Sequence, residues 1–215
     1  TARPRRVVDL GSGTGLSTRF WAGRAGEAVG VEPNADMRAC AEARSAGLAG
    51  IRYQEGTSTA TGLPDSCADI VTVSQALHWM EPAPTFAEAA RVLRSGGVFA
   101  AYDCDWPPAI CWEVEQAYLA LTERVASLER ERGASPGVRK WRKEEHLARM
   151  AASGCFRFTR EVLLHHEEAG DAERLVGLTL SQGSLQALLR HGLSEREIGV
   201  DAFREAARRA LGDGE

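Results

Sequence analysis

Short apolar runs alternate with amphipathic segments along the first half of the chain. The run at 68–73 is almost entirely apolar, which is typical of a strand whose two faces are both covered. After Asn34, a favourable helix N-cap, Met37, Cys40 and Ala41 recur at helical spacing. The pattern predicts strands over 7–10, 28–32, 51–54, 68–73 and 98–102, and helices over 14–24, 35–46 and 85–93.

This order of elements predicts the fold class. Strands that alternate with helices at this spacing form right-handed βαβ units, so we expect an α/β fold with a doubly wound, mostly parallel, Rossmann-like sheet. Such sheets bind their ligands beyond the carboxyl ends of the strands. The residues that follow each strand are therefore the first candidates for a functional site.

The pattern changes after Asp103, where aromatic, proline and cysteine residues become frequent. Helices are predicted over 113–132, 141–153 and most of 171–212, with a break at 133–137 and extended chain at 156–166. We expect a helical cap, residues 104–140, to be inserted after the fifth strand. The core that contains the sheet is predicted to comprise residues 1–103 and 141–215.

Composition and charge narrow the class of protein. The chain has 215 residues and a formal net charge of −4, so nothing draws it to nucleic acid or to an anionic membrane surface. Its five cysteines form no CxxC pair, which argues against a zinc cluster or a disulfide framework and favours a cytoplasmic setting. His165 and His166 would point to opposite faces of a strand, so no metal site is expected there. No apolar run is long enough to span a bilayer.

A glycine-rich turn follows the first predicted strand. Glycines permit positive φ and let a ligand lie against bare backbone, and the helix start offers free N–H groups. A nucleoside ligand is therefore favoured over a tight turn without a ligand. The residues assigned to this site are Asp9, Gly11, Ser12, Gly13, Thr14 and Gly15.

The spacing of the turn discriminates between nucleoside cofactors. The dinucleotide fingerprint GxGxxG would need glycine where this chain has Leu16. The carboxylate of Asp9 would repel a pyrophosphate but suits a ligand with an ammonium and a sulfonium group. These two features favour S-adenosyl-L-methionine over NAD. Glu32, at the end of the second strand, can accept hydrogen bonds from the ribose hydroxyls of either cofactor.

A second motif, residues 75–79, follows the fourth predicted strand. Gln75 is placed to hydrogen-bond the amino-acid end of the cofactor. His78 is the candidate catalytic residue, as a general base or by orienting an acceptor oxygen, although the pattern slightly favours a structural histidine beside Trp79. The acceptor pocket is predicted to be lined by His78, Trp79, Trp106, Trp112, Arg139 and Trp141, or these aromatic residues simply bury the cap helices.

With these motifs in order, the chain resembles the class I S-adenosylmethionine-dependent methyltransferases. More narrowly, it resembles the branch that includes trans-aconitate methyltransferase. The matching stretches cover roughly the first hundred residues. They are 7–15, 29–34 with Met37, 62–64, 68–71, 75–79 and 91–97.

The resemblance implies further roles. Asp9 and the glycines would hold the methionine end, Met37 would pack on the adenine, and Thr57, Ser58 and Thr59 would lie along the adenine edge. Relatives often have an acidic residue in the stretch 57–59, and a hydroxyl binds the adenine amino group less strongly than a carboxylate does. Relatives also carry a helical segment before the first strand and a strand at the end of the sheet, so we expect the natural chain to extend further at both ends.

The sequence therefore predicts a methyltransferase that uses S-adenosyl-L-methionine and releases S-adenosyl-L-homocysteine. The expected reaction is O-methylation of a carboxylate or hydroxyl on a small molecule, by a monomer or homodimer, with no nucleic acid or membrane partner. The alternatives are a non-catalytic S-adenosylmethionine-binding protein and an NAD-dependent oxidoreductase. A nucleic-acid methyltransferase is disfavoured because no basic stripe is visible.

Overall fold

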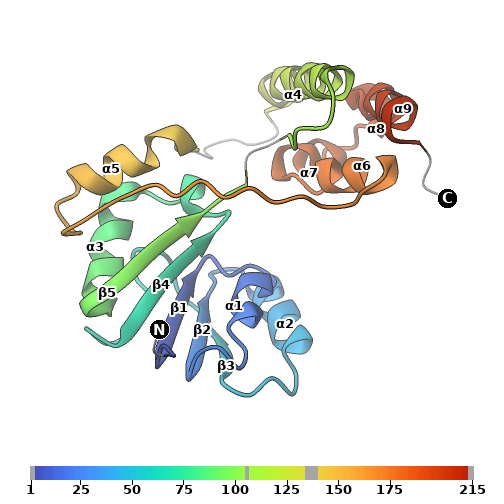
Figure 1. Ribbon diagram of the computed structural model, residues 1–215. Helices are drawn as coiled ribbons and strands as arrows, with labels where there is room; N and C mark the ends of the chain where they lie inside the picture. Colours follow the sequence, from blue (N-terminus) through green and yellow to red (C-terminus); the bar gives the residue numbers. More distant parts are fainter. Residues whose placement is uncertain (1–2, 105–106, 134–139, 213–215) are drawn as a thin grey trace. The chain divides into compact units, whose positions relative to one another are not determined.

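The computed structural model describes residues 3–104, 107–133 and 140–212, which divide into two compact units (Figure 1). The sheet unit comprises Thr1–Cys104 and Arg139–Val162. The helical unit comprises Asp105–Val138 and Leu163–Glu215. Of the helices in the described ranges, none is long and apolar enough to cross a membrane.

The sheet unit is built on a five-stranded sheet in the order β3-β2-β1-β4-β5, and all four pairings are parallel. The order reverses between β1 and β4, which creates the switch point where such sheets bind ligands. The predicted α/β fold is thus confirmed. The strands are β1 (Arg6–Leu10), β2 (Glu27–Val31), β3 (Ile51–Gln54), β4 (Ala68–Ser74) and β5 (Leu93–Tyr102).

Helices cover both faces of this sheet (Figure 1). Val7 and Val8 are both fully buried, and they point to opposite faces. Val7 lies in a cluster with Trp21, directly after α1, whereas Val8 shares a core with Phe86 of α3. The elements of this unit are α1 (Leu16–Phe20), α2 (Ala35–Arg44), the 3₁₀ turn η1 (Leu77–Trp79), α3 (Pro82–Val92), the 3₁₀ turn η2 (Lys143–Glu145) and α5 (His146–Ala152).

Several element boundaries differ from the sequence prediction. The predicted helix 14–24 is reduced to α1, because Gly15 and Gly23 both have positive φ. The predicted helix 141–153 begins as the turn η2 and becomes α-helical only at His146. Residues 156–166 carry no strand, so His165 and His166 are not held on opposite faces of a sheet. The predicted N-cap of α2 is confirmed, since Asn34 Oδ1 accepts a hydrogen bond from Met37 N at 3.0 Å.

The helical unit has its own hydrophobic core. Buried Tyr118 and Leu121 of α4 pack with Leu188 of α7 and Phe203 of α9. The Tyr118 hydroxyl accepts a hydrogen bond from Gln182 Nε2 at 2.8 Å. The helices are α4 (Trp112–Arg132), α6 (Ala172–Leu180), α7 (Gly183–Arg190), α8 (Glu195–Ile198) and α9 (Val200–Leu211).

The division of the chain differs from the predicted one. We expected residues 141–215 to join the sheet, but Leu163–Glu215 groups with the helical unit. The physical reason is that α6, α7 and α9 bury their apolar faces against one another and against α4. Only the first part of the expected segment, up to Val162, belongs with the sheet.

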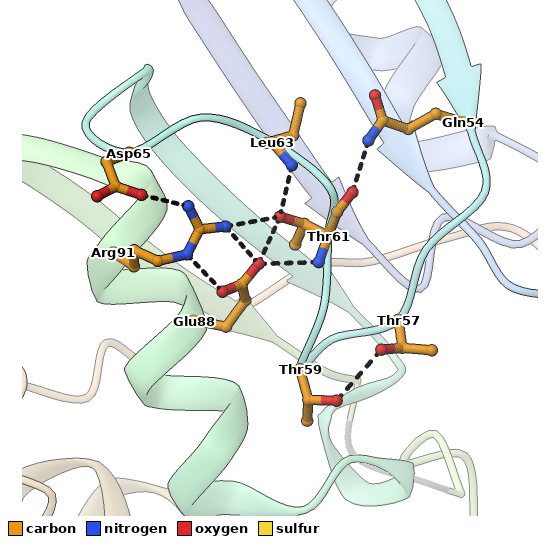
Figure 2. A network of polar contacts seen from close by, with 8 residues as sticks. All are labelled: Gln54, Thr57, Thr59, Thr61, Leu63, Asp65, Glu88 and Arg91. Carbon is orange, nitrogen blue, oxygen red and sulfur yellow. Dashed lines mark hydrogen bonds and ion pairs between the residues drawn. The ribbon is translucent and has the colours of Figure 1, made fainter.

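A buried carboxylate joins α3 to the loop before β4 (Figure 2). Glu88 is 9% exposed, and its Oε1 accepts hydrogen bonds from the backbone N of Thr61 at 2.8 Å and from the Thr61 hydroxyl at 2.6 Å. Arg91 donates to both oxygens of Glu88 and also bonds Asp65. The Arg91 guanidinium and the Thr61 donors lower the pKa of Glu88 from 4.5 to about 2.

We expect the substitution Glu88→Gln to destabilise the fold by about 2 kcal/mol at neutral pH. This is less than the full pKa shift of Glu88 corresponds to, because Arg91 is partly exposed and solvent screens the ion pair. Because the folded-state pKa is lowered, this stabilisation is present above pH 4.5 and is lost as the pH falls towards 2. Urea unfolding across that range measures it, with exposed Glu42→Gln as the control. Equal acid sensitivity of Glu88→Gln and the unsubstituted protein would contradict this assignment.

Candidate functional site

The glycine-rich turn lies at the carboxyl end of β1, at the switch point of the sheet. The backbone N–H groups of Gly11 and Ser12 donate to the carbonyl oxygen of Val31, at 2.9 and 3.2 Å, which ties the turn to the end of β2. Gly11, Gly13 and Gly15 all have positive φ, of 65°, 54° and 80°. The sequence therefore needs glycine at all three positions for backbone reasons alone.

The three glycines differ in what surrounds them. A Cβ on Gly15 would lie 2.2 Å from Tyr53 Oη, and one on Gly11 would lie 2.8 Å from Met80 Cε. A Cβ on Gly13 would meet no protein atom within 4 Å. Gly11 and Gly15 are thus required by packing, whereas Gly13 faces open space above the turn.

Asp9 lies beneath the turn. Its side chain is 0% exposed, and Oδ2 accepts hydrogen bonds from the hydroxyls of Ser17 and Thr18 at 2.5 and 2.6 Å. Oδ1 accepts from the Thr72 hydroxyl at 2.9 Å. Burial raises the pKa of Asp9, and the three hydroxyls oppose this shift. In this geometry Asp9 joins β1, α1 and β4 and supports the turn from below, and its contact with the ligand stays a prediction.

Glu32 directly follows β2 and lies against the turn. It is only 7% exposed, with Oε2 accepting from Gly13 N at 2.9 Å and Oε1 from Asn34 N at 3.0 Å. The Arg38 guanidinium donates to the Glu32 carbonyl oxygen at 2.7 Å. The carboxylate is thus oriented at the rim of the open space over Gly13.

The residues predicted along the adenine are arranged around the same strand ends. Met37, in the first turn of α2, is exposed. Figure 2 shows the side chains of Thr57 and Thr59 in contact. Their hydroxyls lie 3.2 Å apart, and both residues are exposed. Ser58 is engaged elsewhere, because its hydroxyl pairs with that of Thr85 at 2.9 Å.

Gln75 follows β4 with a φ of +52°, an unusual value for a residue that is not glycine. Its backbone N donates to the Tyr102 carbonyl at the end of β5 at 3.0 Å. Its amide satisfies both neighbours when the nitrogen points to Asp103 Oδ1 at 2.7 Å and the oxygen to Cys104 N at 2.5 Å. Strained backbone of this kind is concentrated at functional sites.

His78 and Trp79 lie in η1, just beyond Gln75. Their rings are 4.9 Å apart between centroids and tilted by 44°. Nδ1 of His78 is buried and has no hydrogen-bond partner among the described residues. The backbone N of Trp141 donates to the His78 carbonyl at 2.7 Å, so the structure brings together three of the predicted acceptor-side residues.

Asp103, Lys143 and His146 also lie at the edge of the sheet where β4 and β5 end, beside Gln75 and His78. The sequence analysis did not identify these three residues. Lys143 Nζ is 2.8 Å from Asp103 Oδ1. Asp103 could have been found, because it directly follows a predicted strand. Lys143 and His146 carry no comparable signal, since they lie far along the chain on a separate helical segment.

The other three predicted pocket residues lie outside the described part of the sheet unit. Trp106 and Arg139 lie outside the described residues. Trp112 begins α4 in the helical unit and is 69% exposed. Their contribution to an acceptor pocket stays a prediction.

The residues of the sheet unit fit S-adenosylmethionine. Gly13 offers the bare cradle that a Cβ would fill, and Glu32 places a carboxylate where a ribose can be bound. Exposed Met37 supplies an apolar surface for the adenine. On the other side of the switch point, Gln75 and His78 occupy the end of β4 from which a methyl acceptor would be reached.

Comparisons with known proteins agree with this geometry. Residues 8–101 match a family described as a methyltransferase domain. An uncharacterised methyltransferase of Mycobacterium tuberculosis is 41% identical over 96 residues, which cover 45% of this chain and 38% of that protein. A malonyl-[acyl-carrier protein] O-methyltransferase of Pectobacterium atrosepticum is 34% identical over 96 residues, covering 44% of this chain and 37% of the relative. The chain thus matches less than half the length of these curated relatives.

A solved structure shows the same fold over a longer stretch. A putative type II methyltransferase from Anaeromyxobacter dehalogenans superimposes with a TM-score of 0.65 at 22% identity, covering 99% of this chain and 83% of that one. Residues 8–101 are thus similar to a methyltransferase domain, and the longer superposition shows that the chain shares the fold of that solved structure. The narrower likeness to the trans-aconitate methyltransferase branch stays a prediction.

Proposed function

We propose that the protein transfers a methyl group from S-adenosyl-L-methionine to an oxygen, a carboxylate or a hydroxyl, of a small molecule. The observation that carries the proposal is the open cradle over Gly13 with the oriented carboxylate of Glu32 at its rim. The similarity to a protein named as an O-methyltransferase supports transfer to oxygen. We further propose a cytoplasmic protein, in keeping with its free cysteines.

The chain's own residues would divide the work between the two sides of the switch point. Gly11 to Gly15 and Glu32 would bind and orient the cofactor, which supplies an electrophilic methyl group on a sulfonium. Gln75 would hold its amino-acid end, and His78 would orient the acceptor or take its proton. Alignment of the two reactants and exclusion of water can supply most of the acceleration of such a displacement.

Calorimetric titration with S-adenosylhomocysteine and NAD, side by side, tests the cofactor. We expect S-adenosylhomocysteine to bind with a roughly micromolar dissociation constant and NAD not to bind. Binding of NAD alone would instead support an oxidoreductase. Binding of S-adenosylhomocysteine without turnover of S-adenosylmethionine across phenols and carboxylic acids would indicate a non-catalytic binding protein.

A further inference from the structure

A segment remote in sequence crosses the carboxyl ends of β4 and β5. We call residues 140–146 the crossing segment. Besides the Trp141–His78 backbone bond, Lys143 Nζ pairs with Asp103 at 2.8 Å, and Lys140 Nζ lies 4.7 Å from the centre of the Trp79 ring. These contacts, all within the sheet unit, place the segment beside the motif that follows β4.

The segment ends in a buried histidine. His146 is 9% exposed, and neither Nδ1 nor Nε2 has a hydrogen-bond partner among the described residues. His78 likewise has a buried, unpartnered Nδ1. Buried polar atoms are nearly always paired in proteins, so three such ring nitrogens at one edge indicate groups that a ligand satisfies.

The charges around the two rings favour their neutral forms. Burial lowers the pKa of His78, with Lys143, Lys140 and His146 adding to the shift and Asp103 opposing it. Burial also lowers the pKa of His146, where Arg149 and Lys143 add to the shift and Asp103 and Glu144 oppose it. Both imidazoles are therefore able to accept a proton or a hydrogen bond near neutral pH.

Two cationic groups beside these rings, Lys143 and Arg149, are each paired with a carboxylate. The ammonium of Lys143 is paired with Asp103, whose carboxylate also accepts from the Gln75 amide. A carboxylate acceptor would need an uncompensated cation and no base, whereas a hydroxyl acceptor needs a neutral base. The neutral imidazoles and the paired cations at this edge therefore favour a hydroxyl acceptor.

We propose that His146 binds the methyl acceptor and that the accepting group is a hydroxyl. This inference rests on the proposed function. As the acceptor oxygen forms its bond to the methyl carbon, its O–H bond breaks and the proton passes to Nδ1 of His78. The electron pair of the breaking carbon–sulfur bond remains on sulfur. His146 hydrogen-bonds the same oxygen and orients it towards the methyl group.

Histidine ring NMR spectra of the full chain, saturated with S-adenosylhomocysteine, test this with phenol and benzoate as size-matched probes. We expect phenol to shift the ring signals of His78 and His146, and benzoate at the same concentration to leave them unchanged. His146→Gln should weaken phenol binding roughly tenfold, the effect of losing one hydrogen bond. His191→Gln is the control, because His191 lies on the helical unit and pairs with its own helix through Ala187 O.

Shifts caused by benzoate alone, or by neither probe, would overturn the hydroxyl assignment. Unchanged phenol affinity in a folded His146→Gln variant would overturn the role of His146. If the variant does not fold, the His146 signal of the unsubstituted protein decides, since it either responds to phenol or does not. Failure of S-adenosylhomocysteine to bind in calorimetry would instead remove the proposed function itself, independently of the probe shifts.

Discussion

A valine in place of Gly13 is expected to weaken S-adenosylhomocysteine binding by about a hundredfold or more, which corresponds to roughly 2.7 kcal/mol. The new side chain would meet no protein atom near its Cβ, so it would project into the space above the turn where we propose the nucleoside lies. Calorimetry on the folded variant measures the loss directly.

Gly23→Val is the matched control for this experiment. Gly23 also has a positive φ, of 72°, and a Cβ there would also meet nothing within 4 Å, but it lies after α1 and outside the turn. Both variants should lose about 1–2 kcal/mol or more of stability from the unfavourable backbone conformation. Only Gly13→Val should lose the ligand, and equal affinity in the two variants would place the ligand elsewhere.

Replacement of Asp9 by alanine is expected to destabilise the sheet unit by about 3 kcal/mol or more. The hydroxyls of Ser17, Thr18 and Thr72 would each lose the Asp9 carboxylate as an acceptor, and a buried polar group left unpaired costs about 1–3 kcal/mol. Because two of these hydroxyls belong to α1, the start of that helix and the turn before it should loosen, so cofactor affinity should fall as well. Urea unfolding and calorimetry measure the two effects.

Asp9→Asn separates the shape of this side chain from its charge. The amide keeps one acceptor, and the hydroxyls can rotate to accept from its nitrogen, so we expect a much smaller loss of stability than with alanine. Since burial raises the folded-state pKa of Asp9, the unsubstituted protein should lose stability as the pH rises from 3.8 through that raised value. Asp9→Asn should lack this component, and a difference between the two proteins that is independent of pH would contradict the assignment.

Local patterns determined much of the sheet unit. The third strand was predicted at its observed bounds, and Asn34 was predicted as the N-cap of the helix that follows it, because periodicity and capping depend on residues a few positions apart. The glycine turn was recognised for the same reason: its spacing and the strand before it are contiguous in the chain. The sequence alone also showed Leu16 at the position where a dinucleotide site would have glycine.

Contacts between distant residues could not be predicted in this way. Sequence analysis did not identify the three hydroxyls, one of them from β4, that enclose the Asp9 carboxylate beneath the turn. It also missed the pair formed by Asp103 and Lys143, which only the packing of the crossing segment brings together.

The amphipathic stripes after residue 163 were visible in the sequence, but their partner was not. A stripe specifies that a helix must bury one face and leaves open which surface covers it. The tertiary structure decided this when α4 provided that surface, so these helices joined it rather than the sheet. The sequence by itself determined most of the elements and the glycine-rich turn, because their signals are local. Only the folded chain decided which side chains meet at the acceptor edge, because burial and charge balance depend on residues that are neighbours in space alone.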